Sequence, residues 1–92
     1  MADVFHALSS PVRRQILTML KARDMTAGEI SDQLEVGKST LSGHFNVLKA
    51  ADLVTTERSG TTITYSLNTS VVEEMLALVA EVFGKDKKGS IK

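Results

Sequence analysis

The sequence contains no cysteine. This absence excludes disulfide bonds, thiol redox sensing, a catalytic cysteine and every metal site built from thiolate ligands. The two histidines, His6 and His44, lie on separate predicted elements, whereas a zinc site needs about three or four converging ligands. We therefore predict no metal site and no cofactor.

The chain also lacks an excess of charge of either sign and any long hydrophobic run. Eleven basic and eleven acidic residues cancel, which argues against a protein that coats nucleic acid non-specifically but leaves room for a local basic surface. The longest apolar run, Met75 to Ala80, is far shorter than the roughly 20 residues of a membrane-spanning helix. The N-terminus shows no signal-peptide pattern. We expect a cytoplasmic protein without membrane insertion.

The length of 92 residues corresponds to one domain. We predict that this domain covers residues 1–84 and that residues 85–92 form a flexible tail. A domain of this size buries proportionally little surface, and association with a second copy is a common remedy. A dimer is therefore plausible before any motif is considered.

Helical periodicity dominates the first half of the chain. Residues 2–8 predict a short helix, and Ser10-Pro11 supplies an N-cap and a first-turn proline for a second helix whose arginines decorate its outer faces. Thr26 and Glu29 form a capping box for a third helix. After a tight break at residues 35–37, a fourth helix spans about residues 38–50. Two short helices joined by about three residues are typical of a helix-turn-helix.

After the fourth helix, the spacing of the apolar residues changes from the helical period to alternation every second residue. Alternating β-branched and polar residues, with turn residues at 58–61, predict a two-stranded hairpin over about residues 53–67. A second capping box, Ser70 to Glu73, predicts a last helix that ends near Phe83. The fold class is therefore mainly α (α+β): a winged helix-turn-helix with about five helices and a two-stranded wing.

The outer face of the fourth helix indicates DNA binding. At about 100° per residue, Leu41, Phe45 and Leu48 point inward, and the outward face is small, polar and free of carboxylates. Residues that form helices poorly are unusual on a helix surface, and their presence there favours a role in contact with a partner such as DNA. Together with Lys38 and the wing tip, the predicted DNA-binding residues are Ser39, Thr40, Ser42, Gly43, Asn46, Arg58 and Thr61. For His44, packing and a hydrogen bond to DNA both remain open.

The last helix carries more apolar surface than one packed face can use, which favours a subunit interface. The interface residues that we predict on it are Val72, Met75, Leu76, Val79 and Phe83.

The chain resembles the ArsR/SmtB repressors, and within them the short, cysteine-free SdpR-type autorepressors. The resemblance covers residues 2 to about 83 and rests on SPVRRQIL, on KSTLSGHFNVLK and on the wing return GTTITYSL. It implies a homodimer that binds a palindromic operator and pairs through its first and last helices, which adds Val4, Phe5 and Leu8 to the interface. The family's recognition motif matches Lys38, Ser39, Thr40, Ser42, Gly43 and His44.

Two positions depart from the family pattern. The family commonly has histidine where Gly43 stands and often a basic residue where Thr61 stands, so no operator sequence is implied. The third helix, EISDQL, lacks the paired cysteines of metal-sensing members, and the last helix has no histidine. The resemblance therefore does not imply a metal sensor.

Other functions fit the sequence less well. An enzyme is not expected, because the chain has no cluster of catalytic side chains and no phosphate-binding glycine motif. A protein-interaction module would carry apolar or acidic residues on the outward face of residues 38–50, and these are absent. A metal-responsive repressor is the nearer rival, which titration with zinc or cadmium would distinguish. An inducer, whether a protein or a small molecule, is left open.

Overall fold

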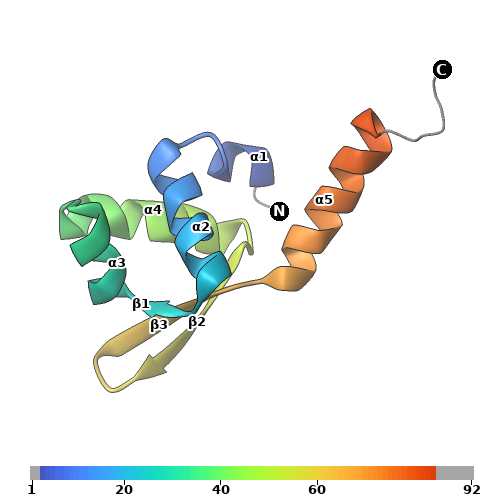
Figure 1. Ribbon diagram of the computed structural model, residues 1–92. Helices are drawn as coiled ribbons and strands as arrows, with labels where there is room; N and C mark the ends of the chain where they lie inside the picture. The colour runs from blue at the N-terminus through green and yellow to red at the C-terminus, as the bar shows by residue number, and fades with distance from the viewer. Residues whose placement is uncertain (1–2, 85–92) are drawn as a thin grey trace.

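The computed structural model describes residues 3–84, and the predicted tail lies outside them. The chain folds in the order α1 (Val4–Ala7), α2 (Pro11–Ala22), β1 (Met25–Thr26), α3 (Ala27–Leu34), α4 (Lys38–Ala50), β2 (Val54–Ser59), β3 (Thr62–Leu67) and α5 (Thr69–Phe83). Figure 1 shows helices α1 to α4 gathered above a small sheet, with α5 leaving the sheet on the opposite side from α3. The winged helix-turn-helix fold predicted from the sequence is confirmed.

Side-chain caps set the start of α2 and α3, as predicted. The Ser10 hydroxyl accepts a hydrogen bond from the Arg13 backbone N–H at 3.3 Å, and Pro11 occupies the first turn of α2. At α3, the Glu29 N–H donates to the Thr26 hydroxyl at 3.1 Å, and the Thr26 N–H donates to Glu29 Oε1 at 2.9 Å. These bonds satisfy backbone donors that a helix start leaves without partners.

The capping box also affects the ionisation of Glu29. The hydrogen bond from the Thr26 backbone, assisted by the charge of Arg23, lowers the pKa of Glu29 from its ordinary value of 4.5. The folded state therefore favours the charged carboxylate. The stabilisation is complete above pH 4.5 and is lost as the pH falls through the lowered pKa.

The predicted capping box at α5 is wrong. The helix begins at Thr69, one residue before the predicted cap, and its N-cap Asn68 makes no side-chain capping bond. Ser70 therefore lies inside the first turn. The Asn68 N–H instead donates to the Leu53 carbonyl at 2.9 Å, which ties the start of α5 to the strand side of the core.

The sheet has one more strand than predicted. Its order is β1-β3-β2, all antiparallel, with Met25 opposite Tyr65 and Thr26 opposite Thr64. β2 and β3 form the predicted hairpin, paired from Val54–Leu67 to Ser59–Thr62. β1 was missed because two residues are too few to show a period-two pattern.

The core is complete without α5. Its buried members all precede the last helix: Ala7, Ile16, Leu20, Met25, Ile30, Leu41, Phe45, Leu48, Ala51, Leu53, Val54 and Tyr65. No residue of α5 is buried, although Val71 and Val72 pack against the core from its first turns. The molecule measures 53 Å along its longest axis and 26 and 22 Å across. The last helix therefore projects from a finished globular body.

We expect the Thr26→Ala variant to lose about 1 kcal/mol of unfolding free energy, because it removes the cap of α3. The matched control is Ser70→Ala, which removes a hydroxyl that does not cap α5 and should change stability by less than about 0.5 kcal/mol. Urea unfolding at neutral pH and equal protein concentrations measures both. Equal losses in the two variants would contradict this account of the helix starts.

Candidate nucleic-acid interface

Helix α4 presents the two faces that its sequence predicts. Leu41, Phe45 and Leu48 are buried. From the start of the helix to Asn46, the exposed residues on the other sides are Lys38, Ser39, Thr40, Ser42, Gly43 and Asn46. The outer face is therefore made of hydroxyl and amide groups, without a carboxylate, which matches what base edges in the major groove require of a reading helix.

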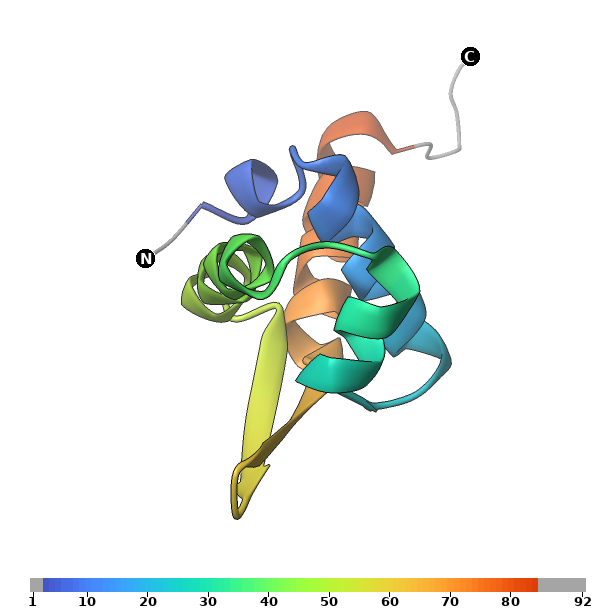
Figure 2. The ribbon, with the colours of Figure 1, turned by 90° about the vertical axis from the view of Figure 1, so that its left-hand side faces the viewer.

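The turn before α4 sets the angle of the helix-turn-helix. α3 ends at Leu34, and its C-cap Glu35 has a φ of 54°, which lies in the left-handed region. The Glu35 N–H donates to the Ser31 carbonyl at 2.9 Å. Gly37 then precedes α4 without a side-chain cap. The three-residue break predicted from the sequence is confirmed, and Figure 2 shows it as the turn that joins α3 to α4.

The wing is a regular hairpin with a two-residue loop. Ser59 pairs with Thr62, so Gly60 and Thr61 form the loop. Gly60 has φ of 63°, the positive value that this loop position requires and that glycine adopts without strain. Figure 2 shows the hairpin projecting beyond α3 and α4, where it can reach a neighbouring stretch of nucleic-acid backbone.

A stacked aromatic pair fixes α4 against the wing. The rings of Phe45 and Tyr65 lie 4.1 Å apart between centroids and 19° from parallel. Burial alone raises the pKa of the Tyr65 hydroxyl. The pair joins the buried face of α4 to the central strand β3, so the helix and the wing share one frame.

A groove of about 420 Å³ runs between α4, the start of α3 and the wing. Its polar lining includes Lys38, Ser42, Thr61 and Thr62, and Phe45 and Tyr65 also line it. The structure thus brings together Lys38, Ser42 and Thr61, three of the predicted DNA-binding residues. A basic group and several hydroxyls beside a concave surface suit a phosphate backbone.

Arg58 is exposed on β2, outside this groove, and pairs across the hairpin with Ile63. Glu57 does not neutralise it: within residues 3–84 the only ion pair joins Arg23 and Glu29 at 3.6 Å. Arg58 therefore presents its charge to solvent near the wing tip.

The prediction that Arg13 lies on an outer face of α2 is wrong. Its side chain is only 8% exposed, and its guanidinium lies 3.0 Å from His44 Nδ1. His44 is partly buried and packs from α4 toward α2, next to the exposed Gly43. The apolar periodicity of α2 gave no sign of this contact, because an arginine at the edge of an apolar stripe is usually solvated.

Known proteins share both the sequence and the fold. A family model described as a helix-turn-helix domain matches residues 8–57. The transcriptional repressor SdpR of Bacillus subtilis is 45% identical over 76 residues, which cover 83% of this chain and 84% of that protein. The chain belongs to the ArsR family of transcriptional repressors.

Two further relatives support this assignment. The transcriptional activator HlyU of Vibrio cholerae is 34% identical over 84% of this chain and 71% of its own length. A structure of HlyU from Vibrio cholerae N16961 has a TM-score of 0.73 with 32% identity, over 89% of each chain. A structure described as a possible transcriptional regulator for arsenical resistance has a TM-score of 0.81 with 26% identity, over 94% of this chain and 88% of that one.

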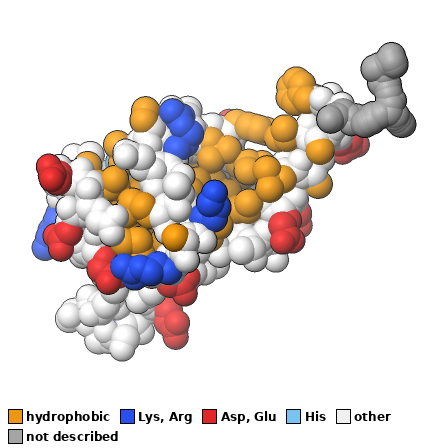
Figure 3. All heavy atoms as spheres, in the orientation of Figure 1, with side chains coloured by type: hydrophobic (Ala, Val, Ile, Leu, Met, Phe, Trp, Pro, Cys, Tyr) orange, Lys and Arg blue, Asp and Glu red, His pale blue; other side chains and the backbone are white. Residues whose placement is uncertain are grey.

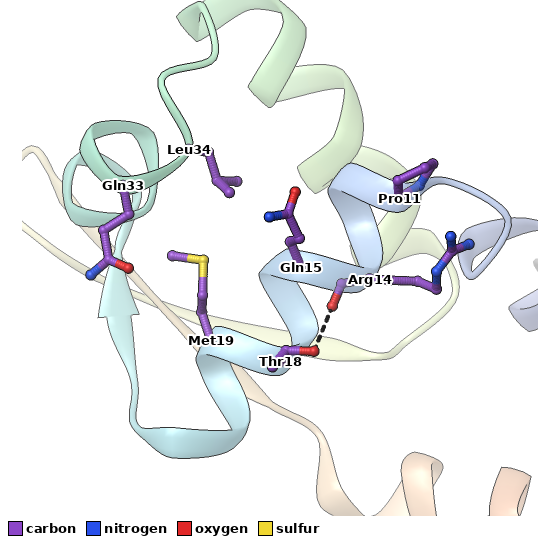
Figure 4. Close-up of a pocket in the computed structure, with 7 residues that line it drawn as sticks. All are labelled: Pro11, Arg14, Gln15, Thr18, Met19, Gln33 and Leu34. Atoms are coloured by element: carbon purple, nitrogen blue, oxygen red, sulfur yellow. Dashed lines mark hydrogen bonds between the residues drawn. The ribbon is translucent and has the colours of Figure 1, made fainter.

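Membership of the ArsR family makes this protein a DNA-binding transcriptional regulator and not an enzyme, as the sequence predicts. A second hollow, of about 500 Å³ between α2 and α3, offers no catalytic chemistry. Figure 4 shows Gln15, Met19 and Leu34 around it, and Arg14 also lines it. The Arg14 guanidinium donates to the Leu8 carbonyl at 2.7 Å. Neither a carboxylate nor a histidine lines this hollow.

Within residues 3–84 of this ArsR-family regulator, no three histidine, aspartate or glutamate side chains converge as a metal site would require. Over the same residues, no helix has both the length and the apolar character needed to cross a bilayer.

Mutations should distinguish contacts with DNA bases from contacts with the phosphate backbone. We expect Ser42→Ala to weaken binding to cognate DNA by about 1–3 kcal/mol and to relax preference at one base position, with little change in salt dependence. Arg58→Ala should weaken cognate and scrambled DNA alike and lower the log–log salt slope by about one per chain. Anisotropy titrations of both duplexes at several salt concentrations measure these effects. An unchanged sequence preference in Ser42→Ala would mean that α4 is not the reading helix.

Proposed function

We propose that the protein is a cytoplasmic homodimeric repressor that binds a palindromic operator. Helix α4 of each subunit reads bases in the major groove, and the wing contacts the adjacent backbone. The observation that carries this proposal is the exposed face of α4, made of Ser39, Ser42, Gly43 and Asn46 and held beside the wing groove.

The chemistry of this face suits sequence reading. Serine hydroxyls donate and accept, and the Asn46 amide can pair with adenine through two hydrogen bonds. A Cβ at Gly43 would meet no other atom of the protein, so this position faces outward. Because glycine has no side chain, the helix can approach DNA closely there. Lys38, at the start of the helix and on the groove, adds the positive charge that a phosphate contact uses.

Exposed apolar surface on α1 and α5 supports the homodimer. Among the described residues, every large hydrophobic side chain that is strongly exposed belongs to these two helices: Phe5, Leu76, Leu78, Val82 and Phe83. Figure 3 shows hydrophobic side chains gathered along α5 and between it and the body. A contiguous apolar surface of this kind is typical of a subunit interface.

The predicted interface residues divide into three groups by their burial within the subunit. Phe5, Leu76 and Phe83 are exposed, the last at 81%, whereas Met75 and Val79 are half-buried. Val4, Leu8 and Val72 pack against the core of their own subunit. Leu78 and Val82 were not predicted, although their helical spacing from the predicted residues could have identified them.

A groove between α1 and α5 gives this surface its shape. It holds about 400 Å³, and most of its lining is apolar, including Val4, Phe5, Met75 and Leu78. Its acidic lining residues are Asp3, Asp52 and Glu74. Because a two-fold interface uses the same patch on both subunits, the protruding end of α5 in one copy can fill this groove in the other. The two copies of α4 would then face successive turns of one duplex.

The direction of regulation is proposed by analogy with the relatives. The relative with 45% identity is named a repressor, and the one from Vibrio cholerae an activator. We favour repression because the higher identity lies with the repressor and because occupation of promoter DNA by a dimer suffices to block transcription.

Selection of bound duplexes from random DNA, followed by footprinting, tests the function. The selected sites should contain two inverted half-sites with centres about 34–36 Å apart or a multiple of this. Zinc, cadmium, arsenite and a chelator should each shift operator affinity by less than about tenfold, or 1.4 kcal/mol. Protection of a single half-site by one subunit would contradict the palindrome, and selection of no sequence would contradict operator binding.

The Leu76→Glu variant tests the interface. Leu76 is 57% exposed in the subunit, so the charge should leave the fold intact but should be costly to bury at an apolar interface. We expect the wild type to sediment as a dimer at micromolar concentration and the variant as a folded monomer. Gln33→Glu adds the same charge at an exposed position of α3 and should remain dimeric. A monomeric wild type, or a dimeric Leu76→Glu, would overturn the interface.

A further inference from the structure

The guanidinium of Arg13 connects three parts of the molecule. Its Nε donates to the Ala7 carbonyl at 2.8 Å, one terminal nitrogen donates to the His6 carbonyl at 3.0 Å, and the other lies 3.0 Å from Nδ1 of His44. Two of these partners are backbone acceptors of α1, and the third is a side chain of α4. All three nitrogens of one buried arginine are thus engaged between a helix proposed for dimerisation and the helix proposed to read DNA.

This geometry fixes the tautomer of a neutral His44 ring. An arginine guanidinium has donors only and stays charged in proteins. His44 Nδ1 must therefore accept the hydrogen bond, so a neutral ring carries its proton on Nε2. The other ring nitrogen, Nε2, is then a hydrogen-bond donor and can bond a phosphate oxygen.

The charge of Arg13 has no carboxylate to neutralise it. Of the residues that the structure describes, none of the acidic side chains lies within ion-pair distance of this guanidinium. Carbonyl dipoles of α1 and the His44 ring are its partners instead. A positive charge directly behind the ring strengthens the donor in front of it and favours an anion there.

The position of His44 on α4 places its ring beside the proposed reading face. Gly43, its neighbour, and Thr40, one turn earlier on the same side, are both exposed. His44 itself is only partly buried. Its side of α4 therefore reaches solvent at the flank of the reading face, where a duplex lying on that face would bring its backbone.

We propose that Arg13 is a positioning residue for DNA binding: it holds His44 as an Nε2–H donor to an operator phosphate and braces α4 against α1. This inference rests on the proposed function of α4 as the reading helix. It assigns His44 to the DNA backbone and not to a base, and it gives the buried Arg13 a role in affinity without contact with DNA.

Two substitutions of His44 test the inward nitrogen, Nδ1, and the outward nitrogen, Nε2, one at a time. His44→Asn keeps an acceptor near the place of Nδ1 and loses the outward donor, whereas the amide of His44→Gln can supply a donor near the place of Nε2. We expect His44→Asn to keep the thermal stability of the wild type and to lose about tenfold in operator affinity, the typical effect of one hydrogen bond to a charged group. His44→Gln should bind within about threefold of the wild type.

The measurements are anisotropy titrations on operator and scrambled duplexes, with thermal unfolding of each variant. Because the contact is to phosphate, the loss in His44→Asn should be equal on both duplexes. His6→Asn, the same change at the other histidine, is the matched control and should bind like the wild type. Wild-type affinity in His44→Asn, equal losses in Asn and Gln variants, or a loss confined to the operator would each overturn the proposal.

The role of Arg13 has a spectroscopic test that does not depend on DNA. At about pH 8, where an ordinary imidazole is neutral, the ¹⁵N shifts of His44 should show the proton on Nε2 in the wild type. Arg13→Lys, which cannot bridge three acceptors in the same plane, should mix the two tautomers and lower operator affinity. Arg14→Lys, the same change at the exposed neighbour, should leave the His44 shifts unaltered. An unchanged tautomer in Arg13→Lys would overturn the positioning role.

The outcomes distinguish this inference from the function on which it rests. If the wild type selects no DNA sequence, the proposed operator binding fails, whatever the His44 spectra show. If the wild type binds its operator and the His44 variants follow none of the expected differences, only the role of Arg13 and His44 fails.

Discussion

The stacking of Phe45 on Tyr65 is the contact on which the DNA-facing part of the molecule depends. It joins the inner face of α4 to the central strand of the sheet, and through that strand to β1 and β2. A helix and a hairpin that moved independently would lose affinity to conformational entropy on binding one duplex. By packing the two aromatic rings in the core, the chain builds the groove between Lys38 and Thr61, to which we assign a contact with DNA in the proposed function.

The last helix is exposed because the core is built from residues that precede it. The residues from Ala7 to Tyr65 complete a core for which α5 supplies no fully buried side chain. Beyond Val71 and Val72, which pack against the core, α5 carries large apolar side chains that a single copy leaves exposed, Leu76 and Phe83 among them. A small domain gains by placing such surface against a second copy, because the buried fraction of its surface rises with the size of the assembly. In the homodimer that we propose, the interface and the spacing of the two copies of α4 would then both depend on α5.

Much of the fold could be predicted from the sequence where a local pattern fixes the structure. The caps at Ser10 and Thr26, the inward face of α4 and the hairpin all follow from short-range spacing, and all were found. The misses involve partners distant in sequence. β1 exists only because Met25 meets Tyr65, forty positions later, and the Arg13–His44 contact likewise spans two helices. Ser70 shows the converse error, since a capping pattern was present but the chain entered α5 one residue earlier.

The placement of Arg13 follows from the shortness of α1. The carbonyls at the end of a short helix are available to further donors. The Arg13 guanidinium bonds the Ala7 carbonyl and also the His6 carbonyl, which accepts from the Ser9 N–H and hydroxyl as well. A guanidinium satisfies both with one rigid group and also favours the negative end of the helix. Its third direction is then fixed by geometry and meets α4 at His44. Arg13 therefore joins α1 directly to α4, the helix that we propose reads DNA.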